Sequence, residues 1–133
     1  MKNIINQFSP YAHIFPRLVL AVTFLIHGYP KILDCSGLIS LFDSKGIPSF
    51  LAYLIGPFEV IGGLLLLYGI FKDWATRVGS ILLAIIMLGA IFVVHIQEGW
   101  SGNEQQLLIL AVCILYAVKG NSINNGISKK YEK

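Results

Sequence analysis

Several ionisable side chains lie inside apolar runs of this chain, where charge is expensive. A charge at the centre of a bilayer costs about 2.5 to 3.5 kcal/mol even on a lenient insertion scale, so such groups normally face the protein interior. Glu59 lies near the middle of one run, and His27 and His95 lie in two others. Carboxylates and imidazoles exchange protons. We therefore predict His27, Glu59 and His95 as catalytic residues.

Two cations on the first apolar run are candidates for binding a substrate. Arg17 and Lys31 are about 40° apart around a helix, and His27 falls on the same stripe. That stripe should face inward, with Lys31 attracting an anionic substrate or a quinone oxygen. We predict that the long side chain of Arg17 reaches Glu59 and forms an ion pair. The alternatives are a Glu59 kept protonated by desolvation, or His27 as its partner.

Glycines surround these positions. Gly56 and Gly62 lie about 60° to either side of Glu59 and Gly63 about 40° away, while Gly28 follows His27 directly. Glycine lets membrane helices approach closely. We predict that Gly28, Gly56, Gly62 and Gly63 serve helix packing. The Arg17–Glu59 pair would fit a purely structural role equally well.

Composition places the chain among membrane proteins. Of its 133 residues 56% are apolar and only 13% are charged, against about a quarter charged in soluble domains. The lysines stand singly or in the tail, so no nucleic-acid partner is expected. Cys35 and Cys113 are interpreted as unpaired apolar fillers because their spacing does not suit a disulfide.

Four apolar runs are long enough, or nearly so, to cross a bilayer as helices, a crossing that takes roughly 20 residues. They cover residues 15–33, 50–71, 74–96 and 104–118. We predict an all-α fold: an integral membrane four-helix bundle in one domain, 1–133, with a polar tail at 119–133. Ser101 and Glu104 have capping-box spacing and would start the fourth helix. Leu38, Leu41 and Phe42 predict a short interfacial helix between spans one and two, as a lid or a connector.

Basic residues predict the orientation, because they flank the cytoplasmic ends of membrane helices. With four spans, both termini lie on the same side of the membrane. That side has eight of the ten basic residues: Lys2, Arg17, Lys72, Arg77, Lys119, Lys129, Lys130 and Lys133. The opposite side has only Lys31 and Lys45. Both termini should therefore be cytoplasmic.

The outer half of the bundle could form a polar pocket. His95 is predicted on one face with Arg77, Ser80, Ala84, Leu88 and Ile91. His27 and His95 could converge there with Lys31, Glu98 and Glu104. Two histidines could instead hold haem b, although their offset depths do not favour it, or a metal together with a carboxylate. We expect no metal and no covalently bound cofactor; a quinone fits better.

The ordered series of motifs resembles the DoxX family of small bacterial membrane proteins. It comprises Arg17, His27-Gly28, Lys31, Gly46-Ile47-Pro48, Glu59 with Gly62-Gly63, Gly69 before a basic loop, and Gly120 after the last span. The resemblance covers residues 15–122. It implies a multi-pass protein of the bacterial inner membrane, related to the DoxD-type subunit of thiosulfate:quinone oxidoreductase. The family's arginine, glycine, lysine and glutamate fall on Arg17, Gly28, Lys31 and Glu59.

The function expected from these features is that of a membrane subunit of a redox system, handling a quinone or a small sulfur or oxygen species. Partner subunits would supply the electrons, and further copies of the chain could form a homo-oligomer in the lipid bilayer. One alternative is a non-catalytic anchor or assembly factor for soluble partners. Another is a small proton-linked transporter, which Glu59 favours although no inverted repeat is evident.

Overall fold

The computed structural model describes residues 2–124, and all regular structure in that part of the chain is helical. The elements are α1 (Lys2–Phe8), η1 (Ser9–Tyr11), α2 (Ile14–Leu33), α3 (Ser36–Ser44), η2 (Ser49–Leu51), α4 (Ala52–Tyr68), α5 (Asp73–Val93), α6 (Gly99–Lys119) and η3 (Gly120–Asn124). The all-α prediction is confirmed. The predicted tail at 119–133 lies mostly outside the described residues, but its first part, η3, contacts α5 and α6.

Four helical segments are long and apolar enough to cross a membrane. They run from Ser9 to Leu33, Ser49 to Tyr68, Asp73 to Val93 and Gly99 to Ile123, and so contain α2, α4, α5 and α6. Helices suit this setting because every interior backbone group is hydrogen-bonded within its own segment. Their outer faces expose large apolar side chains, as contact with lipid requires. The protein is a multi-pass membrane protein, as predicted.

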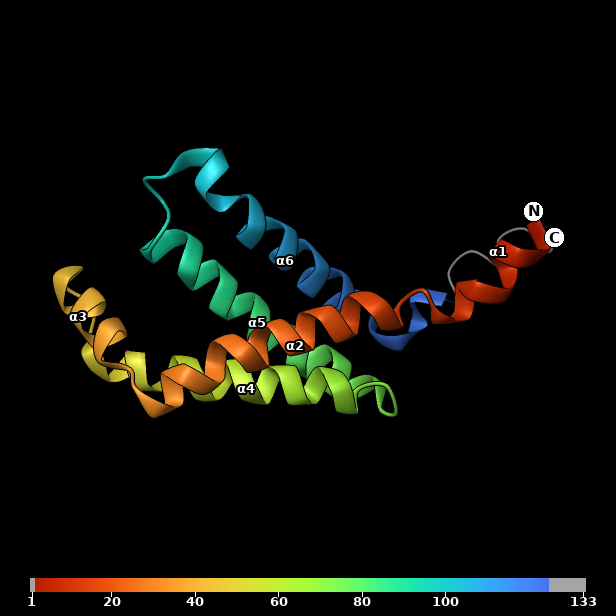
Figure 1. The fold of residues 1–133 in the computed structure, drawn as a ribbon, viewed down its shortest axis with the longest axis horizontal. Helices are drawn as coiled ribbons and strands as arrows, with labels where there is room; N and C mark the ends of the chain where they lie inside the picture. The colour runs from red at the N-terminus through yellow and green to blue at the C-terminus, as the bar shows by residue number, and fades with distance from the viewer. Residues whose placement is uncertain (1, 125–133) are drawn as a thin grey trace.

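Each of the four long helices packs against the long helix next to it in the chain (Figure 1). α2 lies antiparallel along α4, α4 packs on α5, and α5 packs on α6. Figure 1 shows the α5–α6 hairpin meeting α2 and α4 near the α4–α5 turn and diverging from them toward the end where α3 lies. The central apolar cluster comprises Leu20, Ala21, Phe24, Leu66, Leu83, Ile86, Cys113 and Tyr116.

Glycines bring the helix backbones into contact. A Cβ added to Gly28 would lie 2.8 Å from Glu59 Cβ and 2.9 Å from the carbonyl oxygen of Gly56. Further along the same interface, a Cβ on Gly63 would lie 3.0 Å from the carbonyl oxygen of Ala21. Gly62 faces Leu83 instead. The predicted packing glycines thus divide between the α2–α4 and α4–α5 interfaces.

The connections differ from prediction in one detail. α3 forms between spans one and two as expected and contacts η2 and α4 through a side that buries Phe42. The capping-box prediction is wrong, because α6 begins at Gly99 and Ser101 and Glu104 lie inside it. Gly99 has a φ of 67°, which lets the chain turn sharply just before the helix. Both cysteines are free, and Cys113 is fully buried in the apolar cluster, as predicted.

Candidate functional site

Lys31 of α2 and Glu59 of α4 form an ion pair inside the bundle. Lys31 Nζ lies 2.6 Å from Glu59 Oε1 and 2.8 Å from Oε2. The Glu59 side chain is only 4% exposed, whereas that of Lys31 is 29% exposed. The pair depends on the glycine contact beside it: Gly28 and Gly56 leave no side chains between the helices, so Lys31 lies alongside the carboxylate. Such a buried carboxylate requires a cation or a proton.

The predicted Arg17–Glu59 ion pair is wrong, because Glu59 pairs with Lys31 and not with Arg17 or His27. The antiparallel register sets Gly28 against Gly56 and Ala21 against Gly63. Arg17 is therefore level with the far end of α4, about 21 Å along α2 from Lys31 at 1.5 Å per residue. The two cations share a face of α2 but serve opposite ends of the bundle.

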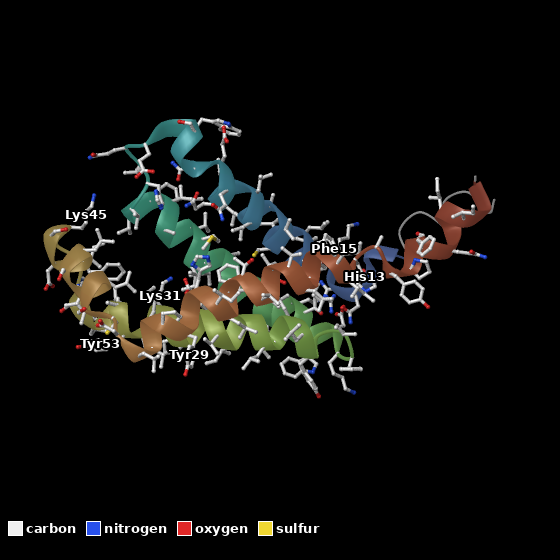
Figure 2. The ribbon with its side chains drawn as sticks, in the orientation of Figure 1. His13, Phe15, Tyr29, Lys31, Lys45 and Tyr53 are labelled. Carbon is white, nitrogen blue, oxygen red and sulfur yellow. The ribbon has the colours of Figure 1, made fainter. Side chains whose placement is uncertain are left out.

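A cavity of about 280 Å³ opens beside the ion pair, where the α5–α6 hairpin diverges from α2. Figure 2 shows Lys31 on the side of α2 that faces α5, with Tyr29 on the opposite side. The lining combines apolar and polar side chains from four helices and the α5–α6 turn: Thr23, Phe24, His27, Lys31, Glu59, Met87, Ala90, His95, Gln105, Gln106 and Ile109. No residue of α3 lines it, which favours the connector role for that helix.

Both predicted histidines line this cavity. His27 projects from α2 and is exposed. His95 lies beyond the end of α5, in the turn before α6, with its Nδ1 2.7 Å from Glu98 Oε2. The predicted convergence of His27, Lys31 and His95 therefore occurs. Glu98 joins through His95, whereas Glu104 is exposed and does not line the cavity.

The face predicted for α5 is rotated from the observed one. Ser80 is buried as expected, but Leu88 is 41% exposed. The buried residues of α5 are Ala75, Thr76, Gly79, Ser80, Leu83 and Ile86. This set follows the contacts of α5 with α4 and α6, so the helix turns its small residues toward its neighbours. His95 reaches the cavity because the helix ends at Val93 and the chain bends.

A second depression, of about 460 Å³, lies on the other side of α2 and α4. Leu25, Ile26, Tyr29, Pro30 and Val60 line it. The phenol of Tyr29 is the one polar side-chain group among these five residues. The acids, bases and amides that line a cavity are therefore found in the smaller one, between the helices.

Arg17 belongs to a separate polar network at the other end of the bundle. Its side chain is fully buried, and Nη2 donates to Asn121 Oδ1 at 2.8 Å. The guanidinium lies over the ring of Tyr116, 5.2 Å from its centroid; a desolvated cation–π contact contributes about 2 kcal/mol. Nε and Nη1 have no partner among the described residues. Arg17 does not line the cavity.

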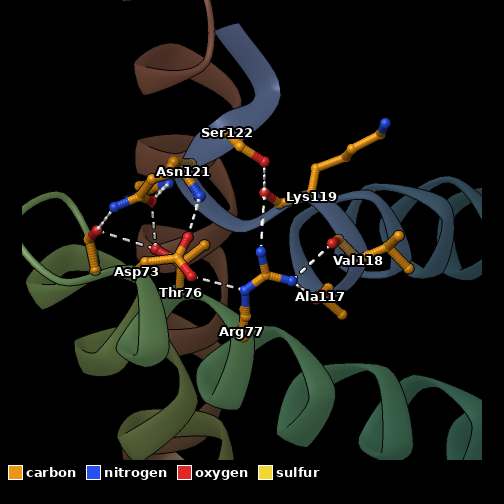
Figure 3. A network of polar contacts seen from close by, with 10 residues as sticks. Asp73, Thr76, Arg77, Ala117, Val118, Lys119, Asn121 and Ser122 are labelled. Carbon is orange, nitrogen blue, oxygen red and sulfur yellow. Dashed lines mark hydrogen bonds and ion pairs between the residues drawn. The ribbon is translucent and has the colours of Figure 1, made fainter. Parts of the chain in front are cut away.

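Asn121 is the centre of this network (Figure 3). Its Oδ1 also accepts from Thr76 Oγ1 at 2.8 Å, and its Nδ2 donates to the carbonyl oxygen of Gly69 at 2.8 Å. Its backbone N–H donates to Asp73 Oδ1 at 2.6 Å. One residue just after α6 thus connects η3 to α2, to the α4–α5 turn and to α5.

Arg77 completes this end of the bundle. It pairs with Asp73 at 2.7 Å and donates to the last carbonyl oxygens of α6, those of Ala117, Val118 and Lys119. These carbonyl groups have no partner within the helix, and a cation there also suits the helix dipole. Gly120, with φ of 54°, allows the turn that follows.

Sequence reasoning missed most residues contributed by α6 and η3. Gln105 and Gln106 line the cavity, and Asn103 donates to the carbonyl oxygens of His95 and Gly99 at 2.8 Å each. The available signal was the density of amides at the start of an otherwise apolar helix. For Asn121 the signal was its place directly after Gly120.

The comparisons with known proteins agree with this architecture. The family model described as DoxX matches residues 13–96, which contain Arg17, Lys31, Glu59 and His95. A Bacillus subtilis (strain 168) protein named "Putative oxidoreductase CatD" is 37% identical over 106 residues, 79% of this chain and 76% of that protein. A Haemophilus influenzae (strain ATCC 51907 / DSM 11121 / KW20 / Rd) protein named "Uncharacterized protein" is 30% identical over 95 residues, 71% of this chain and 66% of that protein. No solved structure matches. On the match to its family model, the chain belongs to the DoxX family.

Proposed function

We propose that this protein is a membrane subunit of a redox system and binds the ring of a quinone in the cavity beside Lys31 and Glu59. The observation that supports this most strongly is the composition of that cavity. It places a buried ion pair and two histidines against the apolar side chains of Phe24, Met87 and Ile109. Ligand sites of this kind are mostly apolar with a few polar groups that fix orientation.

The size of the cavity suits a ring. An apolar cavity of about 150 Å³ is enough to bind benzene, and this one measures about 280 Å³. It lies beside helices whose outer faces are lipid-compatible, so an isoprenoid tail could remain among the acyl chains. Lys31 would donate a hydrogen bond to one quinone oxygen while Glu59 balances its charge.

The chemistry requires two electrons and two protons for each quinone reduced to a quinol. In this proposal a partner subunit oxidises a reduced sulfur anion and passes on the electrons, and the histidines supply the protons. The relative from Bacillus subtilis has "oxidoreductase" in its name, which supports a redox role without specifying a substrate. The proposed location is the bacterial inner membrane, with both termini cytoplasmic; the positive residues at that end of the bundle support this orientation.

Quinone binding by the purified protein tests the proposal. The protein in lipid nanodiscs is incubated with decylubiquinone, and the bound quinone is extracted and quantified against empty nanodiscs. We expect about one quinone per protein and at least a tenfold loss of affinity in Lys31→Met with Glu59→Leu, which removes both charges together. Glu104→Gln is the matched control, because Glu104 is exposed and does not line the cavity.

The outcomes distinguish the competing functions. Binding no greater than to empty nanodiscs would overturn the proposal and leave the anchor or assembly role. If the double variant still binds the quinone, the cavity is not the quinone site. Proton uptake into proteoliposomes without any quinone would favour the proton-linked transporter instead.

A further inference from the structure

The turn between α5 and α6 holds His95 in a fixed position. Asn103 is 7% exposed, and its amide donates to the carbonyl oxygens of His95 and Gly99. The backbone N–H of Glu98 also donates to the carbonyl oxygen of His95, at 3.0 Å. Two independent contacts thus fix the backbone of this residue, although it lies outside the helices.

Both ring nitrogens of His95 have partners. Nδ1 lies 2.7 Å from Glu98 Oε2, and because a carboxylate accepts, Nδ1 carries the hydrogen. Nε2 lies 3.3 Å from Gln106 Nε2 and therefore accepts from that amide in the neutral ring. Gln106 Oε1 is buried without a partner among the described residues. Rotation of this amide would present Oε1 to a protonated Nε2, so the same three residues accommodate the ring in either protonation state.

Exposure decreases from the turn into the bundle. The Glu98 side chain is 51% exposed, that of His95 is 25% exposed, and that of Glu59 is 4% exposed. The titratable and charged groups that share the cavity with His95 are His27 and Lys31 from α2 and Glu59 from α4; the polar lining groups of α6 are the amides of Gln105 and Gln106. His95 therefore lies between a carboxylate in contact with water and the interior ion pair.

We infer that Glu98 and His95 form a proton path from the water at the α5–α6 turn to the ligand in the cavity, and that Gln106 positions the imidazole. This inference rests on the proposed function. Glu98 takes a proton from water and passes it to Nδ1 of the neutral ring in its Nε2–H tautomer, in which Gln106 Oε1 accepts from Nε2. The imidazolium then donates its Nε2 proton to an oxygen of the reduced ligand: an O–H bond forms, the Nε2–H bond breaks, and the ring is left neutral with its hydrogen on Nδ1. Proton exchange with water restores the Nε2–H tautomer before the next transfer.

With thiosulfate as the electron donor, the proposed reaction needs a source of two protons. Two thiosulfate ions couple to one tetrathionate and release two electrons but no protons. Quinone reduction with this donor must therefore draw both of its protons from water. A thiol donor would release protons as it is oxidised. Thiosulfate is therefore the electron donor that requires the larger uptake of protons from water.

The test uses membrane vesicles from the native host, with the gene replaced by each variant, and follows decylubiquinone reduction by thiosulfate from pH 6 to 8. General acid–base groups typically contribute at least about 10²-fold, so we expect His95→Gln to lower turnover by that factor. Glu98→Ala should lower it most at high pH, where water supplies few protons. Glu98→Asp and millimolar acetate added to Glu98→Ala should each restore turnover. Glu104→Ala is the matched control.

Each outcome has a separate meaning. If wild-type vesicles reduce the quinone and Glu98→Ala matches them at every pH, the proton path is overturned while the quinone site stands. A loss in Glu98→Ala that is equal at all pH values and that acetate does not rescue shows a structural role and also overturns it. Under this inference, Glu98→Ala does not change quinone binding by the protein in nanodiscs. The nanodisc assay therefore tests the proposed function separately from the proton path.

Discussion

Lys31 and Glu59, separated by 28 positions in the chain, form an ion pair in which Lys31 Nζ lies 2.6 and 2.8 Å from the two carboxylate oxygens of Glu59. The pair joins α2 to α4 immediately beside the Gly28–Gly56 contact. It is both a helix-packing contact and part of the cavity wall. Variants that keep the charge balance therefore separate its two roles.

Removal of one partner of the pair should be more harmful than removal of both. Breaking a buried pair typically costs about 3 to 5 kcal/mol, whereas replacing both partners by apolar residues is often nearly neutral. We expect Lys31→Met alone to lower the midpoint of thermal unfolding in detergent, and Lys31→Met with Glu59→Leu to recover most of it. Circular dichroism provides the measurement; equal destabilisation by the single and double variants would contradict the coupling.

Gly28→Ala should destabilise the bundle and perturb the ion pair. The new Cβ would meet Glu59 Cβ at 2.8 Å and a backbone oxygen at 2.9 Å, so α2 and α4 must separate. Overpacking of this kind costs about 1 to 3 kcal/mol. Gly89→Ala is the control: nothing lies within 4 Å of its Cβ, and alanine favours a helix by about 1 kcal/mol. Thermal unfolding of the two variants should shift in opposite directions.

Asn121→Ala should loosen the end of the bundle that contains Arg17. The substitution removes the hydrogen bond that the buried guanidinium donates to Asn121, together with the bonds of Asn121 to Thr76 and Gly69. An unsatisfied buried group costs about 1 to 3 kcal/mol, and more when it is charged. Limited proteolysis after Lys119 should become faster. Ser101→Ala, an exposed serine at the other end of α6, should leave the rate unchanged.

The acid dependence of α3 should follow Asp34. The backbone N–H of Ser36 donates to Asp34 Oδ1 at 2.9 Å and lowers the pKa of this carboxyl. Because the folded-state pKa is depressed, the contribution is present above the ordinary aspartate pKa and is lost as the pH falls through the lower folded value. The protection factor of the Ser36 amide, which is its exchange rate relative to the intrinsic rate at the same pH, should therefore fall in acid. Asp34→Ala should show low protection at every pH, unlike Asp43→Ala.

The two native cysteines provide a test of orientation. Cys35 is partly exposed between α2 and α3, whereas Cys113 is fully buried. If both termini are cytoplasmic, a membrane-impermeant maleimide added to spheroplasts should label Cys35 and spare Cys113. Cys35→Ser should abolish the labelling. Labelling of Cys35 only after the membrane is permeabilised would reverse the orientation.

The sequence determined the number of spans. For α2 and α4 it also determined most of the residues on the inward-facing side of each helix. Arg17 and Gly28 on α2, and Gly56, Glu59 and Gly62 on α4, are buried as their angular positions predicted. This could be predicted because rotation around a helix is fixed locally, at 100° per residue. The choice of apolar residues for the outer faces follows from the lipid environment.

Only the tertiary structure decided how far each helix is displaced along its neighbour. Because of that displacement, Glu59 pairs with Lys31, and Arg17 donates a hydrogen bond to Asn121 at the other end of the bundle. It depends on which glycines and side chains of two different helices meet, and no periodicity within one helix contains that information. The same reason explains why Gln106 and Asn121 became visible as partners only once α6 and η3 were packed against the other helices.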